Sequence, residues 1–245
     1  MNFHQRRPHL FLKYKSFVYD DLPFMNNNKF PATRLYALRH GETEWNVETR
    51  IQGNLNICLN DKGHEQAARL GAALAKRHQH EPITAIYSSD LWRAYDTALA
   101  ISKAIGIPVV TDEGLRERGF GFFEGMSYAE IEAKHPELSA RWRARDPHFS
   151  PEGGESLTQF RDRILTASQA ITARHAGEQI AIVAHGGVLD VLYRAANGLE
   201  IQAKRDWNLG NAVINRLSWV PTTFSMVSWN DTSHLEEDAL NEAHA

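Results

Sequence analysis

Two short apolar segments of this 245-residue chain, residues 35–38 and 180–184, each end at a polar sequence that contains a histidine and a glycine. Residues 180–184 are rich in β-branched side chains and apolar on both faces, which is typical of a central strand in a parallel sheet. Residues 35–38 lie between Pro31 and Gly41 and predict a second buried strand. Because open α/β sheets bind ligands at the carboxyl ends of their strands, the two segments predict a binding site at one sheet edge.

The residues after these strands are suited to phosphoryl chemistry. Neutral imidazole is a nucleophile and guanidinium holds anions in a planar geometry, so Arg39 and His40 form a plausible catalytic pair. Gly41 allows backbone to approach a ligand closely. The second strand ends in His185 and Gly186. We therefore expect a histidine that attacks phosphorus while an arginine holds the phosphoryl oxygens.

A third strand, residues 83–87, is followed by the serine-rich residues 88–90 and by a predicted helix over 91–105. Residues 88–90 are strong candidates for the cap of that helix. Arg93 then lies in the first turn of this helix. The amino terminus of a helix attracts anions and repels cations, so the arginine is tolerable there if a bound anion lies between it and the helix terminus. Three strand ends thus bring arginine and histidine side chains to one sheet edge, which favours a functional site over coincidence.

Glu117 lies in a segment, residues 115–125, that mixes charged residues with glycine and phenylalanine and predicts a loop. Apolar surroundings would raise the pKa of its carboxyl group and prepare it as a general acid. The neighbouring Arg116 and Arg118 would lower that pKa. The sequence does not decide whether the pKa of Glu117 is raised or lowered.

The remaining pattern alternates helices with strands and predicts an α/β fold with a parallel sheet. A helix begins at Asn60 or Asp61 and buries Ala67, Leu70 and Leu74. The other expected elements are a strand at 109–110, helices at 127–135, 136–145, 155–175 and 188–196, and a closing hairpin of 212–219 with 224–229.

We expect three regions along the chain: an N-terminal extension (1–32), one domain (33–231) and a C-terminal tail (232–245). The extension mixes basic and aromatic residues without periodicity. It is either an adventitious segment or an arm that binds a partner, and Met25 offers an alternative start, so the presence of residues 1–24 in the native protein is open.

Composition excludes several classes of protein. A net charge of -3 gives no general attraction to nucleic acid or anionic membrane, and no apolar run is long enough to span a bilayer. The single cysteine, Cys58, excludes an intramolecular disulfide and fits a reducing compartment, for which we predict the cytoplasm; we expect its side chain in the core. The twelve histidines form no paired helical motif, so no metal is expected.

Arg141, Arg143 and Arg145 alternate along a predicted helix. They form either a solvated basic surface or a border that attracts an anionic substrate.

The motifs together resemble the histidine phosphatase superfamily, which includes the cofactor-dependent phosphoglycerate mutases. The segments that carry the resemblance occur in family order at 38–46, 88–94, 115–117, 152–156 and 184–187. The resemblance implies a three-layer α/β/α sandwich with a mostly parallel central sheet.

The resemblance also implies roles. His40 would become phosphohistidine, Glu117 would protonate the leaving oxygen, and Arg39, Arg93 and His185 would bind and stabilise the phosphoryl group. The further residues expected to touch phosphate or substrate are Asn46, Gln52, Gly53 and Gly186.

Two activities of the family are open. We favour a phosphatase that hydrolyses small phosphomonoesters without a cofactor, because residues 153–156 look like the phosphatase branch. The alternative is a mutase that interconverts 3- and 2-phosphoglycerate with 2,3-bisphosphoglycerate, although residues 118–121 read Arg-Gly-Phe-Gly where such mutases carry an Arg-His-Tyr-Gly-like run. A non-catalytic phosphate-binding module is a third reading. The expected partner is a small phosphorylated metabolite, and a homodimer is an open alternative.

Overall fold

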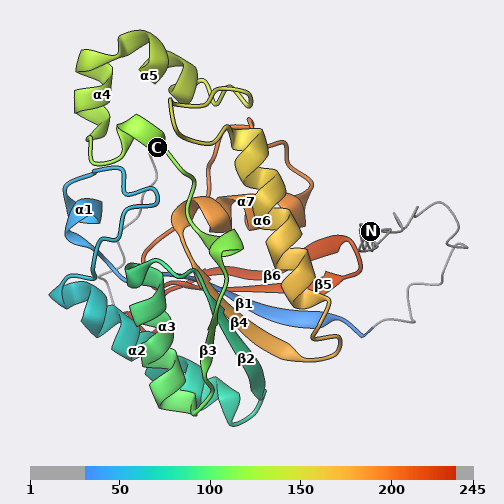
Figure 1. Cartoon of the computed structure of the whole chain (residues 1–245). Helices are drawn as coiled ribbons and strands as arrows, with labels where there is room; N and C mark the ends of the chain where they lie inside the picture. The colour runs from blue at the N-terminus through green and yellow to red at the C-terminus, as the bar shows by residue number, and fades with distance from the viewer. Residues whose placement is uncertain (1–30, 236–245) are drawn as a thin grey trace, which may run out of the picture.

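The computed structural model describes residues 31–235, which form a central six-stranded sheet with helices on both faces (Figure 1). The strand order is β3-β2-β4-β1-β5-β6. The strands are β1 (Thr33–Arg39), β2 (Ile83–Ser88), β3 (Val109–Thr111), β4 (Gln179–Ala184), β5 (Ile214–Val220) and β6 (Thr223–Asp231). The expected extension, residues 1–32, lies almost wholly outside the described residues, as do Met25 and the tail from residue 236.

The sheet is mostly parallel, as predicted. Strand β4 pairs in parallel with both β1 and β2, and β2 pairs in parallel with β3. Strands β5 and β6 form the expected hairpin, and β5 runs antiparallel to β1. The carboxyl ends of β1, β2 and β4 therefore lie side by side at one edge.

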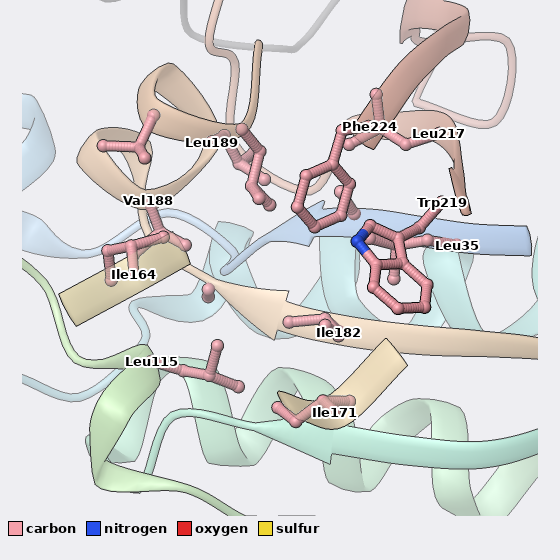
Figure 2. Close-up of a cluster of buried hydrophobic side chains, with 14 of the residues drawn as sticks. Leu35, Leu115, Ile164, Ile171, Ile182, Val188, Leu189, Leu217, Trp219 and Phe224 are labelled. Atoms are coloured by element: carbon pink, nitrogen blue, oxygen red, sulfur yellow. The ribbon is translucent and has the colours of Figure 1, made fainter. Parts of the chain in front are cut away.

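Helices cover the two faces of the sheet and complete the predicted three-layer sandwich (Figure 1). On one face, α2 (Asp61–His78) and α3 (Trp92–Ile105) bury Leu70, Leu74 and Ile101 against the sheet. On the other face, α6 (Leu157–Thr172) and α7 (Gly186–Asn197) bury Ile164, Ile171 and Leu189. Figure 2 shows this second cluster, in which Phe224 of the hairpin lies near Leu189 and Trp219 lies near Leu35 of β1.

Two helix starts differ from the prediction. Helix α3 has Leu91 as its N-cap and no side-chain cap, so residues 88–90 do not cap it; Ser89 instead accepts a hydrogen bond from the Leu91 amide. Helix α7 begins at Gly186, directly after His185. The predicted helix start at residue 188 was therefore two residues late.

A smaller group of elements lies beyond the carboxyl edge of the sheet. It contains α1 (Glu44–Val47), α4 (Tyr128–Lys134), α5 (Pro136–Arg143) and the short 3₁₀ turn Gly121–Phe123. A second 3₁₀ turn, Glu113–Leu115, instead places Leu115 in the main cluster beside α6. Figure 1 shows α4 and α5 together, apart from the sheet. These elements have their own apolar cluster, made by Ile51, Phe123, Ile131 and Phe149.

Two further observations concern the predicted core and tail. Cys58 is exposed, so its predicted core position was wrong; it lies in an irregular segment where no apolar periodicity fixes which side chains face inward. Leu235, inside the predicted tail, is buried in the cluster beneath α2. Within residues 31–235, no helix combines the length and the apolar character that crossing a membrane requires.

Candidate active site

Arg39 is the last residue of β1, and His40 follows it at the carboxyl edge of the sheet. The His40 amide donates to the carbonyl of Ala184, 3.0 Å away, so the ends of β1 and β4 are joined at this point. The guanidinium of Arg39 donates to the carbonyl of Leu209 and is 2% exposed. A side chain with so little freedom is preorganised for an anion.

Gly41 is required by packing. A Cβ at Gly41 would lie 2.4 Å from the carbonyl oxygen of Gly63, and one at Gly63 would lie 2.0 Å from that of Glu42. The chain after His40 thus lies directly against the start of α2, a close backbone contact that only glycine permits. The expected approach of Gly41 to a ligand stays a prediction.

The imidazole of His40 is held in one tautomer. Its Nδ1 lies 2.7 Å from the carbonyl oxygen of Gly41. Since a carbonyl can only accept, Nδ1 carries the proton and Nε2 keeps its lone pair. Burial lowers the pKa of His40 well below its ordinary value, and the charges of Arg93 and Arg39 act in the same direction. His40 is therefore neutral and nucleophilic near neutral pH.

His185 lies behind His40, with the two ring centroids 5.3 Å apart. It is fully buried, and neither of its ring nitrogens has a hydrogen-bond partner among residues 31–235. Burial, followed by the charge of Arg93, lowers its pKa well below the ordinary value. A buried imidazole with two unused nitrogens is costly unless a ligand supplies a partner.

Arg93 lies in the first turn of α3, as predicted, and is 1% exposed. Its two terminal nitrogens donate to the carbonyls of Gly53 and Leu55, each at 2.8 Å. Arg93 thereby fixes the loop that contains Gly53 and Leu55, while its charge lowers the pKa values of both His40 and His185.

The carboxyl group of Glu117 resolves the question that the sequence left open. Burial raises its pKa, and this effect outweighs the hydrogen bonds from the Gly187 and Arg118 amides and the charges of Arg93 and Arg39. Its Oε2 lies 2.9 Å from the Gly187 nitrogen and its Oε1 lies 2.8 Å from the Arg118 nitrogen. A carboxyl group with a raised pKa is suited to donating a proton.

A cavity of about 520 Å³ unites these side chains. Eight of the nine residues named from the sequence border it: Arg39, His40, Asn46, Gln52, Gly53, Arg93, Glu117 and Gly186. His185 does not border it and lies behind the His40 ring. The Asn46 carboxamide oxygen accepts from the Thr43 backbone and hydroxyl, which completes a capping box on α1.

Several cavity residues were not identified from the sequence. They include aromatic (Phe120, Tyr128, Trp142), basic (Arg118, Lys204, Arg205) and acidic residues (Glu132, Asp190). The three alternating arginines divide between the two interpretations given above, a solvated basic surface and a border of the substrate site. Arg143 and Arg145 border the cavity, whereas Arg141 is exposed and pairs with Asp146. No sequence signal separates them, because α5 ends at Arg143 and Arg145 has a left-handed backbone with φ of 51°.

The described part of the chain contains no group of three or more histidine, cysteine or carboxylate side chains placed to hold a metal ion. Around His40 the cavity is bordered by the guanidinium groups of Arg39 and Arg93, and these cations suit an anion.

Comparison with known proteins identifies the family. Residues 35–232 match the family model of the histidine phosphatase superfamily (branch 1). The chain belongs to the histidine phosphatase superfamily. This membership confirms the resemblance that the five sequence segments indicated, and it explains why histidines end the two central strands.

Members of the superfamily with assigned names include mutase-like proteins and phosphatases. The chain is 39% identical over 205 residues to phosphoglycerate mutase-like protein 4 of Arabidopsis thaliana, which covers 83% of this chain and 87% of that protein. It is 38% identical over 206 residues to the metal-independent phosphoserine phosphatase of the same plant, covering 83% and 84% respectively. A phosphoserine phosphatase from Entamoeba histolytica, solved with phosphoserine, has a TM-score of 0.72 and 27% identity and covers 83% of this chain and 99% of its own.

Proposed function

We propose that the protein is a phosphatase that hydrolyses small phosphomonoesters through a phosphohistidine intermediate on His40. The observation that carries the proposal is the fixed tautomer of His40, whose Nε2 retains its lone pair beside a cavity bordered by Arg39, Arg93 and Glu117. A neutral nucleophile, two cations and a carboxyl group with a raised pKa are the parts that phosphoryl transfer requires.

In the first step, Nε2 of His40 attacks phosphorus and the bond between phosphorus and the ester oxygen breaks. Glu117 gives its proton to the departing oxygen, so an alcohol leaves. Arg39 and Arg93 stabilise the charge that develops on the phosphoryl oxygens, and His185, whose ring centroid lies 5.3 Å from that of His40, is assigned a further hydrogen bond to one of these oxygens.

In the second step, water attacks the phosphoryl group and the bond between phosphorus and nitrogen breaks. The Glu117 carboxylate takes a proton from the water, which restores the acid, and phosphate leaves. Asn46, Gln52, Gly53 and the amide of Gly186 complete the phosphate site in this proposal. Gln52 is 8% exposed, and its Oε1 lacks a hydrogen-bond partner in the described range.

No step of this mechanism uses a metal or an organic cofactor. The named metal independence of the Arabidopsis phosphoserine phosphatase supports that part of the proposal. Its name and that of the Entamoeba enzyme also support a small phosphorylated metabolite as the partner. A cytoplasmic location and a homodimer stay predictions.

A paired assay on purified protein tests the proposal. We expect efficient phosphate release from a panel of phosphomonoesters and negligible interconversion of 3- and 2-phosphoglycerate when 2,3-bisphosphoglycerate is present. Rapid interconversion with little phosphate release would establish a mutase instead. Binding of phosphate without either reaction would establish the non-catalytic module.

A further inference from the structure

The loop that leads into β5 contacts both residues at the carboxyl end of β1. The guanidinium of Arg39 donates to the carbonyl of Leu209, and the amide of Ala212 donates to the carbonyl of His40 at 3.2 Å. The side chain of Asn211 donates to the same His40 carbonyl at 3.1 Å. All three loop residues are at most 1% exposed, so the loop holds its neighbours in a fixed position.

The peptide group between His40 and Gly41 is held at both of its polar atoms. Its oxygen accepts from Asn211 and Ala212, and its N–H donates to the hydroxyl of Thr97 at 3.0 Å. The next carbonyl, that of Gly41, lies 2.7 Å from Nδ1 of His40 and fixes the tautomer of the imidazole. Rotation of the peptide group would move this carbonyl, so the contacts of the loop contribute to the position of the imidazole ring.

The NH₂ group of Asn211 also determines the orientation of the Asn46 carboxamide. Its Nδ2 lies 3.3 Å from an Asn46 atom that accepts from the Thr43 amide at 3.1 Å. Because both of these neighbours donate, that atom is the carboxamide oxygen of Asn46. Asn46 borders the cavity, and the end of its carboxamide that can donate to a phosphoryl oxygen is the NH₂ group.

Asn211 is a costly residue if packing is its only role. Its Oδ1 is buried and has no hydrogen-bond partner within residues 31–235, and Ala212 beside it has a left-handed backbone with φ of 54°. Asn215 is equally buried, but its carboxamide donates to the Ala37 carbonyl at 3.1 Å and accepts from the Asn230 amide at 2.7 Å. Costs such as those at Asn211 cluster at functional sites, which directs attention to the contacts of its NH₂ group.

We propose that Asn211 is a positioning residue for phosphoryl transfer. Its NH₂ group holds the peptide between His40 and Gly41, and it turns the NH₂ group of Asn46 toward the phosphoryl oxygens. Asn211 is not among the residues that border the cavity, so it acts through these neighbours. The inference rests on the proposed phosphatase function and adds a residue that lies outside the five sequence segments of the family.

The test is a double-mutant cycle of Asn211→Ala and Asn46→Ala in the full-length protein. Each variant is measured for kcat/KM with p-nitrophenyl phosphate and for the Kd of orthovanadate, which mimics the transferring phosphoryl group. In the wild-type background, we expect Asn211→Ala to lower kcat/KM and to raise the Kd by roughly tenfold or more. In the Asn46→Ala background the same change should have a clearly smaller effect, because the contribution through Asn46 is already lost.

The matched control is Asn215→Ala. It removes an equally buried asparagine whose NH₂ group also donates to a carbonyl of β1. We expect it to lower the temperature of thermal unfolding but to keep the wild-type kcat/KM and vanadate affinity. The thermal transition also shows whether each variant of the cycle is folded.

A second measurement needs no change at residue 211. In ¹⁵N NMR spectra of the wild-type protein, the side-chain NH₂ signal of Asn46 should shift when orthovanadate is added, because that end of the carboxamide meets the ligand. The NH₂ signal of Asn211 should exchange slowly with solvent, since the side chain is fully buried and hydrogen-bonded.

No loss from Asn211→Ala, or equal losses in both backgrounds, would overturn the inference, and so would a loss of the same size from Asn215→Ala. An Asn46 NH₂ signal that vanadate leaves unchanged would overturn it even if Asn211→Ala does not fold. A wild-type protein that binds vanadate but hydrolyses no phosphomonoester would end the proposed function alone, because the cycle in vanadate affinity still tests the role of Asn211.

Discussion

The amide of Gly187 donates to the Glu117 carboxylate at 2.9 Å, so the candidate proton donor is held by the first turn of the helix that begins after His185. A Cβ at residue 187 would lie 2.3 Å from Oε1 of Glu117. The close contact joins a loop carboxylate to the carboxyl end of β4, although the two residues lie seventy positions apart in the chain.

Gly187→Ala should displace Glu117 and reduce proton donation to the leaving oxygen. We expect kcat for alkyl phosphates to fall by about 10² or more, and kcat for p-nitrophenyl phosphate, whose leaving group needs little protonation, to fall far less. Gly198→Ala, at the C-cap of the same helix, is the control: a Cβ there meets no atom within 4 Å, so the substitution adds only the backbone strain of its φ of 64°, far from Glu117 in the sequence. Equal losses on both ester types would contradict the role of Glu117.

The pH dependence should follow Glu117 and His40. The raised pKa of Glu117 keeps it protonated to higher pH than an ordinary carboxyl group. The lowered pKa of His40 keeps it neutral to lower pH than an ordinary imidazole. The kcat/KM for alkyl esters should therefore fall as pH rises through the pKa of Glu117 and fall again as pH drops through that of His40. Glu117→Gln should lack the alkaline fall; an unchanged profile would assign that fall to another group.

His40→Ala should abolish turnover, because no other described residue offers an unprotonated ring nitrogen at the cavity. Arg39→Lys should lower kcat by about 10² even though it keeps the charge, since an ammonium cannot reproduce the planar contact with two oxygens. Steady-state kinetics and labelling of the enzyme by ³²P-substrate measure both effects. A His40→Ala protein that still becomes labelled would remove His40 as the nucleophile.

Gly121→Ala should destabilise the elements beyond the sheet edge. Gly121 has φ of 53°, and a Cβ there would lie 1.9 Å from the carbonyl oxygen of Glu152. Gly106 has φ of 77° but open space around it, so Gly106→Ala isolates the backbone strain of about 1 kcal/mol, or a Tm loss of roughly 2–4 °C. Thermal unfolding should show a clearly larger loss for Gly121→Ala, and similar losses would argue against the close contact.

Hydrolysis should be insensitive to chelators. We expect activity in excess EDTA to equal that in buffer, because the proposed mechanism assigns every charge at phosphorus to protein side chains. Loss of activity in EDTA with recovery on adding Zn²⁺ or Mg²⁺ would point to a metal-dependent hydrolase.

The strand ends were predictable from the sequence because their pattern is local. Residues 180–184 could only be a buried strand, and the polar residues that follow could only lie at its carboxyl end. Once three strands are parallel, the positions of His40, Arg93 and His185 follow from geometry alone.

The rest of the cavity depends on contacts between distant segments. The two short helices between residues 118 and 154 were predicted, but α5 ends at Arg143 and Arg145 has a left-handed backbone, so the position of Arg145 beside Asp190 could not be read from spacing. Asp190 itself lies on a predicted helix, but its pairing with both Arg194 and Arg145 joins segments that spacing does not connect. The exposed side chain of Cys58 could not be foreseen for the same reason: irregular backbone has no inward face defined by sequence.

The separation between the strand ends and the elements of α4 and α5 has a consequence for how such a protein changes over generations. The groups proposed to act on phosphorus lie at strand ends and helix starts that the sheet holds rigidly, while much of the far cavity wall is formed by short segments with an apolar cluster of their own. Mutations in that wall can alter which alcohol is accepted without disturbing the phosphoryl chemistry. New substrates are thus accessible to this scaffold by gradual drift in one peripheral segment.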